Sequence, residues 1–252
     1  MRLAYNIRPL SFVEILDRAF QVFRDHFSVL AGISAVLWLP YGAILAVDNT
    51  SQVVFVIAEI AFLLVLPVMS VALTAAVASL YLDLPITVGD AYRSIRIILT
   101  PIMGTYLLLY LLVILGLIAL VIPGISLMNC WSLSGPVMIV EHRFGMTALR
   151  RSRQLVIGAW WRTFGIFFVA FLIAEVPAYV LQVLWSFIPV FGPILTAGTS
   201  AIASSYSLVV LVIYYFDRRC RTEGFDLRYL AEQIRSETAA ASRGTGESSS
   251  LA

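Results

Sequence analysis

Long apolar runs alternate with short polar connections along this 252-residue chain. Most runs hold about twenty residues or more, which is enough for an α-helix to cross ~30 Å of bilayer hydrocarbon. The pattern predicts an all-α polytopic membrane protein with six transmembrane helices. We expect these spans at about residues 28–47, 52–81, 101–122, 125–140, 164–188 and 193–216.

Three shorter stretches, at residues 11–27, 87–98 and 146–158, are amphipathic, with apolar residues recurring at three and four positions. Ser11 with Glu14, and Thr87 with Asp90, match the pattern of a helix-capping box. We expect the three helices to lie in the headgroup region on the cytoplasmic side. In the first helix the apolar face comprises Phe12, Leu16, Ala19, Phe20, Phe23 and Phe27.

Each pair of predicted spans follows one of these amphipathic stretches, and residues 91–96 resemble residues 148–153. The order favours three parallel copies of one helix-hairpin unit. A chance match of six residues is the alternative.

Composition and charge fit a membrane protein. The chain is 60% hydrophobic, whereas a soluble domain is about 45–50% apolar. All seventeen basic residues are Arg, and none lies in the connection directly after the first, third or fifth apolar run. Cytoplasmic loops are enriched in basic residues, so both termini are expected in the cytoplasm. The absence of Lys favours a GC-rich bacterial genome, and therefore the inner membrane.

The fourth span, residues 125–140, is the weakest of the six because it is short and polar, with Asn129, Ser132 and Pro136. We keep it because the arginines from Arg143 to Arg162 would otherwise face outward. Pro123-Gly124 is the expected outer turn before it.

Residues 1–237 are assigned to the membrane domain and residues 238–252 to a disordered cytoplasmic tail, since the tail is rich in Ala, Ser and Gly without apolar periodicity. In the last span, Ala197, Ala201 and Ser205 recur at four-residue spacing. Such small residues allow helix backbones to approach closely.

Catalytic signatures are missing from the sequence. It contains no zinc-protease helix, no nucleophile-elbow motif and no glycine-rich phosphate loop. We therefore expect no enzyme activity, no cofactor, no metal ion and no nucleic-acid partner. Cys130 and Cys220 are expected to be free thiols.

The arginine clusters allow two interpretations. They orient the spans and extend to the headgroups, or they bind anionic headgroups or a phosphorylated ligand, at ~1 kcal/mol for each basic residue near the surface. The candidate contacts are Arg93, Arg96, Arg150, Arg151, Arg153 and Arg162.

Glu59 and Glu175 are the ionisable residues within the predicted spans. A charge at the centre of a transmembrane helix costs on the order of 2.5–3.5 kcal/mol. They are candidates for a proton or cation site. The alternative is a protonated carboxyl that is hydrogen-bonded between helices.

Three parts of the chain resemble a large bacterial family of integral membrane proteins, related to the membrane domain attached to some glycerophosphoryl diester phosphodiesterases. They are Arg8-Pro9-Leu10 with Glu14-Ile15-Leu16-Asp17, Phe20, Phe23-Arg24 and Phe27; Pro136-Val137, Val140-Glu141, Gly145, Ala148-Leu149 and Ser152 with Trp160-Trp161-Arg162; and Tyr215, Asp217, Arg219, Glu223-Gly224 and Asp226-Leu227. The resemblance implies a six-helix membrane domain. The phosphodiesterase activity belongs to a separate barrel domain, for which this sequence contains no counterpart.

Two functions remain open. The first is a non-catalytic membrane module that binds lipid or a partner membrane complex at its cytoplasmic face. The second is a small transporter or permease subunit that uses Glu59 and Glu175.

Overall fold

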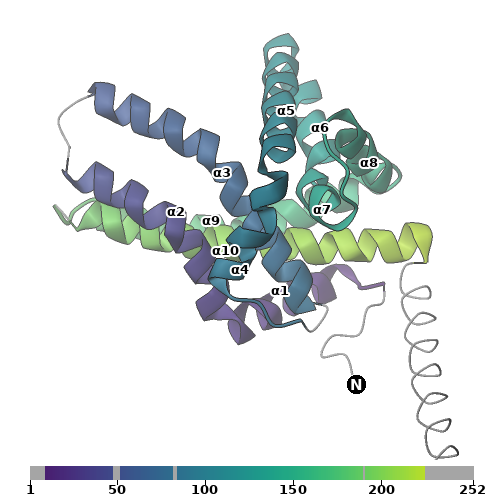
Figure 1. Ribbon diagram of the computed structural model, residues 1–252, viewed down its shortest axis with the longest axis horizontal. Helices are drawn as coiled ribbons and strands as arrows, with labels where there is room; N and C mark the ends of the chain where they lie inside the picture. Colours follow the sequence, from purple (N-terminus) through teal and green to yellow (C-terminus); the bar gives the residue numbers. More distant parts are fainter. Residues whose placement is uncertain (1–8, 48–51, 82–83, 190, 225–252) are drawn as a thin grey trace, which may run out of the picture.

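The computed structural model describes residues 9–47, 52–81, 84–189 and 191–224, and these ranges contain helices without strands. The predicted disordered tail, 238–252, and residues 225–237 of the predicted domain lie outside the described ranges. Figure 1 shows the helices in sequence order. They are α1 (Phe12–Asp25), α2 (Phe27–Val47), α3 (Gln52–Tyr81), α4 (Val88–Ile95), the 3-10 turn η1 (Arg96–Ile98), α5 (Leu99–Ala119), α6 (Val121–Trp131), α7 (Ser134–Val140), α8 (Met146–Val156), α9 (Trp160–Trp185) and α10 (Gly192–Glu223).

The all-α class is confirmed in the described ranges, and helix length and hydropathy indicate a membrane protein. Five helical segments in the described ranges are long and apolar enough to span a membrane. They correspond to α2, α3, α5 with the α4 segment before it, α9 and α10. Many large apolar side chains on these helices point away from the protein, as a lipid-facing surface requires.

The fourth predicted span is not one continuous helix. Helix α6 ends at Trp131, and the separate helix α7 begins at Ser134. The hydroxyl of Ser152, on α8, lies at this break: it donates to the carbonyl of Cys130 at 2.8 Å and accepts from the N–H of Leu133 at 3.2 Å. A side chain of α8 therefore takes the place of helical hydrogen bonds that would join α6 to α7.

The predicted outer turn at Pro123-Gly124 is also wrong by a few residues. Helix α5 ends at Ala119, and the turn is made by Leu120, whose backbone is extended. Pro123 lies in the first turn of α6, where its missing N–H costs no helical hydrogen bond. A Cβ on Gly124 would collide with the side chain of Leu117, so glycine here allows α5 and α6 to pack closely.

The three amphipathic helices are present, and both predicted capping boxes are formed. In α1, the Ser11 N–H donates to the Glu14 carboxylate at 2.6 Å. In α4, the Asp90 N–H donates to the Thr87 hydroxyl at 3.2 Å. In α8, the buried side chains are Ala148, Leu149, Ser152, Leu155 and Val156.

The predicted apolar face of α1 and the face that the structure buries overlap only in part. The structure buries Ile15, Ala19 and Val22 against the other helices, whereas Phe20 is 54% exposed. Apolar residues that recur every three or four positions show which face of a helix is apolar. They do not show whether protein or lipid covers it.

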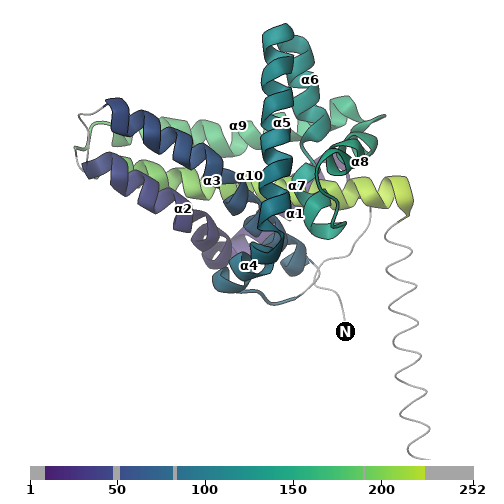
Figure 2. The ribbon, with the colours of Figure 1, turned by 45° about the horizontal axis from the view of Figure 1, so that its top comes forward.

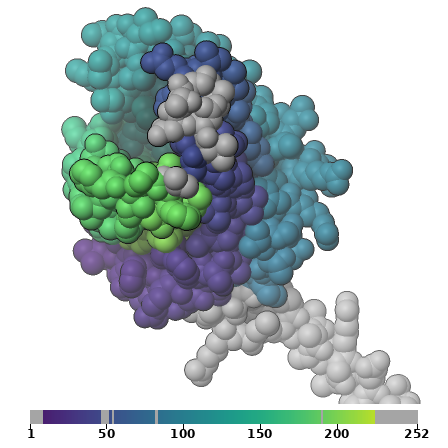
Figure 3. Space-filling view, turned by 90° about the vertical axis from the view of Figure 1, so that its left-hand side faces the viewer, coloured from purple at the N-terminus to yellow at the C-terminus, as the bar shows by residue number. Residues whose placement is uncertain are grey.

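Helix α10 runs through the middle of the molecule and contacts α1, α2, α3, α8 and α9. Figures 1 and 2 show α2, α3, α9 and α10 gathered into one bundle, with the α5–α6 hairpin standing away from it. Figure 3 views the bundle from the end at which α2 and α9 finish, where α2 packs beside α9 and α10. We call the opposite end, where α1, α4, α8 and the last turns of α10 lie, the arginine-rich end.

Small residues hold α10 against α2, as the spacing in the last predicted span indicated. Ala197, Ala201 and Ser205 are buried. The hydroxyls of Ser205 and Ser34 lie 2.7 Å apart. Near the other end of this contact, a Cβ on Gly42 would lie 2.6 Å from Cβ of Ala197. Because lipid is as apolar as a leucine side chain, such close packing and hydrogen bonding provide the helix association.

Gly42→Ala should destabilise the α2–α10 contact. The new methyl group would also lie 2.8 Å from the carbonyl oxygen of Pro193, and backbone cannot move aside as a flexible side chain does. We expect a loss of about 1–3 kcal/mol, measured as a lower melting temperature in detergent or nanodiscs. Gly104→Ala is the matched control because a Cβ there meets nothing within 4 Å. Equal melting temperatures for the two variants would contradict close α2–α10 packing.

Candidate functional site

A buried carboxylate near the end of α10, Asp217, connects three distant parts of the chain. Its side chain is 0% exposed. The N–H of Leu10 donates to it at 2.8 Å, Arg162 pairs with it at 3.1 Å, and Arg221 pairs with it at 3.0 Å. Both arginines also donate to the carbonyl of Leu10, at 2.7 and 2.6 Å. The segment before α1, the start of α9 and the end of α10 are thereby joined.

A second carboxylate, Glu141, follows α7 and binds the adjoining side of α10. It accepts a hydrogen bond from Arg151 on α8 at 2.8 Å and one from the hydroxyl of Tyr215 at 3.0 Å. Arg151 also pairs with Glu223, and Glu223 pairs with Arg219 at 3.2 Å. This network joins α8 to the last two turns of α10.

Ion pairing keeps Arg151 charged although it is largely buried. Its side chain is 15% exposed. Burial lowers the pKa of Arg151, but the hydrogen bonds with Glu141 and Glu223 and their negative charges outweigh burial and raise the pKa above its usual value. The charge of Arg151 is therefore balanced within the protein.

The six arginines predicted as lipid contacts divide into two groups. Arg151 and Arg162 form ion pairs with the carboxylates Glu141 and Asp217. The other four are exposed and form no salt bridge with a described residue; they are Arg93, Arg96, Arg150 and Arg153. The exposed group lies on α4, η1 and α8 at the arginine-rich end.

Charged residues of this end that were not singled out as site residues from the sequence are Glu141, Asp217, Arg218, Arg219, Arg221 and Glu223. A signal was available, because these residues lie in or beside the second and third stretches that carry the family resemblance. The structure brings the described parts of the three stretches together, with Leu10 from the first stretch bound to Asp217.

Glu59 and Glu175 have separate partners. The hydroxyl of Tyr41, on α2, donates to Glu59, and the hydroxyl of Ser207, on α10, donates to Glu175 at 3.2 Å. Each carboxyl thus joins two helices, and no described hydrogen bond links the two glutamates. Their participation in transport remains a prediction.

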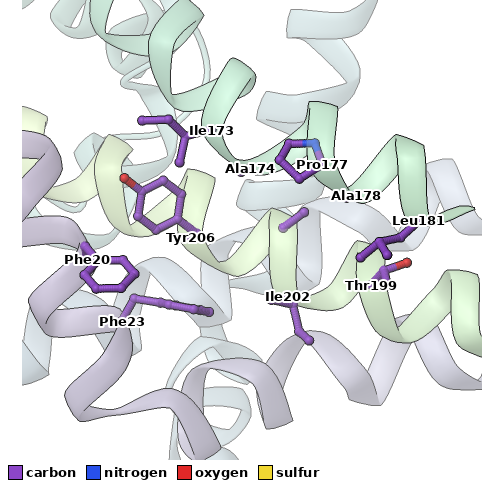
Figure 4. Close-up of a pocket in the computed structure, with 11 residues that line it drawn as sticks. Phe20, Phe23, Ile173, Ala174, Pro177, Ala178, Leu181, Thr199, Ile202 and Tyr206 are labelled. Atoms are coloured by element: carbon purple, nitrogen blue, oxygen red, sulfur yellow. The ribbon is translucent and has the colours of Figure 1, made fainter.

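An apolar cleft of ≈ 270 Å³ lies between α1, α9 and α10. Figure 4 shows Phe20 and Phe23 of α1 facing Ile173 and Pro177 of α9 across it. Glu175 is not among the residues that line it, and Thr199 and Tyr206 supply its polar atoms.

Comparisons with protein-family models, with curated proteins and with solved structures found no match. The fold and hydropathy define an all-α membrane protein with a network of arginines and carboxylates at one end of its helix bundle. The family resemblance remains a prediction.

Asp217→Asn should strongly destabilise the protein. The change keeps the shape of the side chain and removes the negative charge that balances Arg162 and Arg221. Removal of one partner from a buried ion pair costs about 3–5 kcal/mol. Thermal unfolding of the purified protein measures the loss.

The matched control for this prediction is Asp25→Asn, which removes the same charge from a surface pair. Asp25 lies 3.1 Å from Arg24, and the two side chains are 43% and 68% exposed. Exposed pairs contribute about 0–1 kcal/mol. A melting temperature for Asp217→Asn as high as that for Asp25→Asn would show that the Asp217 network does not stabilise the fold.

Proposed function

We propose that this protein is a non-catalytic integral membrane module of the bacterial inner membrane, and that its cytoplasmic face binds anionic lipid headgroups. On this proposal it belongs to the family related to the membrane domain of glycerophosphoryl diester phosphodiesterases. A partner membrane protein with an acidic surface is the other occupant that this face would accept.

The observation that carries the proposal is the exposed group of arginines: Arg93, Arg96, Arg150 and Arg153. They lie on short amphipathic helices beside the long apolar helices, which is where lipid headgroups meet a membrane protein. Without salt bridges to described carboxylates, their charges are available to phosphates. Each contributes ~1 kcal/mol near an anionic surface.

We propose a six-crossing topology in which α6 and α7 together make the fourth crossing. The ion pair of Arg151 with Glu223, and that of Arg162 with Asp217, support it, because α8 and the end of α10 then lie on one side. The arginines of α4 belong to the same side by the positive-inside rule. The chain between α4 and α8 must then cross an even number of times. The recurring order of one amphipathic helix followed by a hairpin supports three repeats.

The transporter alternative has weaker support. Transporters gather substrate-binding groups at the midplane, on interrupted helices. Here each of the two glutamates is bound to a hydroxyl of a different neighbouring helix. That arrangement is expected for carboxyls that join helices within lipid.

Single cysteines placed in a variant with Cys130→Ser and Cys220→Ser test the topology. We expect an impermeant thiol reagent added to intact cells to label positions 122 and 186, which replace the exposed Ile122 and Ser186. Positions 93 and 154, which replace Arg93 and Gln154, should react only after the membrane is opened. Labelling of position 154 from outside would exclude the six-crossing topology.

Replacing all four exposed arginines with Gln should reduce the preference of the protein for anionic lipid by about tenfold or more, because ~1 kcal/mol is lost for each charge. The measurement is mass spectrometry of phosphatidylglycerol and phosphatidylcholine, with identical acyl chains, retained by the purified protein. Salt should weaken the wild-type preference. Replacement of the same four residues with Lys is the matched control and should retain it. An unchanged lipid ratio in the Gln variant would leave the arginines with a purely topogenic role.

A further inference from the structure

The start of helix α9 forms one wall of a pocket at the arginine-rich end. The pocket has a volume of ≈ 520 Å³ and is lined by Gly158, Ala159, Trp160, Trp161, Arg162, Arg218 and Arg221. The residue before the helix is Ala159, and no side chain caps the first turn. The first N–H groups of a helix carry a partial positive charge and bind anions when no side chain caps them.

Three arginines converge on this pocket, and one carboxylate lies beside them. Asp217 pairs with Arg162 and Arg221. Arg218 is 8% exposed, and its Nε donates to the carbonyl of Leu155 at 2.8 Å. Within the described ranges Arg218 has no carboxylate partner. A buried cation without a counter-charge is costly. Among the described residues, three arginines and one carboxylate meet at this pocket, and an anion would balance the excess of positive charge.

Two further donors on the lining residues have no hydrogen-bond partner among the residues that the structure describes. The Nε atom of Arg162 and the indole Nε1 atom of Trp160 are both buried and unpaired. An unsatisfied buried donor costs roughly 1–3 kcal/mol, and such groups are rare in folded proteins. Both belong to residues that line the pocket. Both atoms are closed to solvent in this conformation, so an acceptor bound there would satisfy them once the Trp160 and Arg162 side chains turn toward the pocket.

The position of the pocket matches the level of lipid phosphates. Trp161 is 78% exposed, as expected for an indole that anchors a helix at the membrane interface. The exposed apolar residues of α9, among them Phe168 and Phe171, begin within the next two turns. A lipid whose chains lie beside α9 would therefore place its phosphate next to Trp160 and Arg162.

We propose that the pocket between the start of α9 and the end of α10 binds a phosphate group, with Arg162, Arg218, Arg221 and the indole N–H of Trp160 as donors. Guanidinium groups pair with phosphate through two parallel hydrogen bonds. The phosphate belongs to an anionic phospholipid or to a soluble phosphorylated compound. The inference deepens the proposed lipid-binding function by naming a specific site. That site is separate from the exposed arginines of α4 and α8.

Trp160→Phe is the most selective test. It removes the unpaired N–H and retains an aromatic ring that can stack on Phe164, 5.5 Å away between ring centroids. Native mass spectrometry of the full chain with added phosphatidylglycerol should show one saturable site in the wild type. The dissociation constant should rise roughly tenfold in the variant, as expected for one hydrogen bond to a charged group.

Trp185→Phe is the matched control. The Nε1 atom of Trp185 is also buried and unpaired, but the residue lies at the far end of α9, beside a pocket without arginine. It should bind phosphatidylglycerol like the wild type. Arg218→Gln should lose the saturable site. Its melting temperature without lipid, measured beside that of the wild type, distinguishes lost binding from lost folding.

Inorganic phosphate distinguishes the two sources of the ligand. If phosphate alone raises the melting temperature of the wild type but not that of Trp160→Phe, and phosphatidylglycerol shows no saturable site, the phosphate site is supported and its ligand is soluble. If Trp160→Phe and Trp185→Phe bind both probes like the wild type, the phosphate site is overturned. The proposed lipid-binding function is tested separately by the Gln variant of the four exposed arginines, which leaves this pocket intact.

Discussion

The carboxylate of Asp217 is the interaction on which the arginine-rich end depends. A fully buried carboxylate costs several kcal/mol unless partners replace its hydration. Here Leu10, Arg162 and Arg221 supply them. Since these partners come from the segment before α1, from α9 and from α10, the charge can be buried only when all three segments meet. The same meeting point places the start of α9 beside Arg218 and so forms the pocket that we propose for phosphate.

Close packing holds the helices together at the other end of the bundle, whereas ion pairs hold them together at the arginine-rich end. Small side chains on α10 let α2 approach, and Gly42 is needed where the backbones come nearest. The hydrogen bond between the hydroxyls of Ser34 and Ser205 also joins the two helices at this contact. Different interactions therefore hold helix α10 at its two ends. Close packing and hydrogen bonding hold it beside α2, and buried charges hold it at the arginine-rich end.

The arginines on one side of this protein do three different things. In the proposed topology, all of them contribute to the charge asymmetry that orients the spans. Arg151 and Arg162 also hold helices together through carboxylates. Arg218, which lacks such a partner among the described residues, lines the pocket proposed to bind phosphate. The four exposed arginines are the proposed contacts of lipid headgroups. Counting charges in a sequence therefore does not distinguish arginines that pair with carboxylates from arginines that are open to a ligand.

The sequence by itself determined what depends on neighbouring residues. Capping boxes need groups three residues apart, and helix type follows from apolar residues within a turn, so α1, α4 and five long apolar segments were predictable. The break between α6 and α7 was not, because Ser152 enters it from another helix. The Asp217 network was not either, since its donor Leu10 is 207 residues away.

Tertiary structure alone also decided which apolar faces are covered by protein. Lipid and a protein interior are equally apolar, so the pattern in α1 could not distinguish the buried Ile15 and Val22 from the exposed Phe20. Charged residues differ greatly in energy between water, lipid and protein, so the proposed topology rests on them rather than on the apolar pattern.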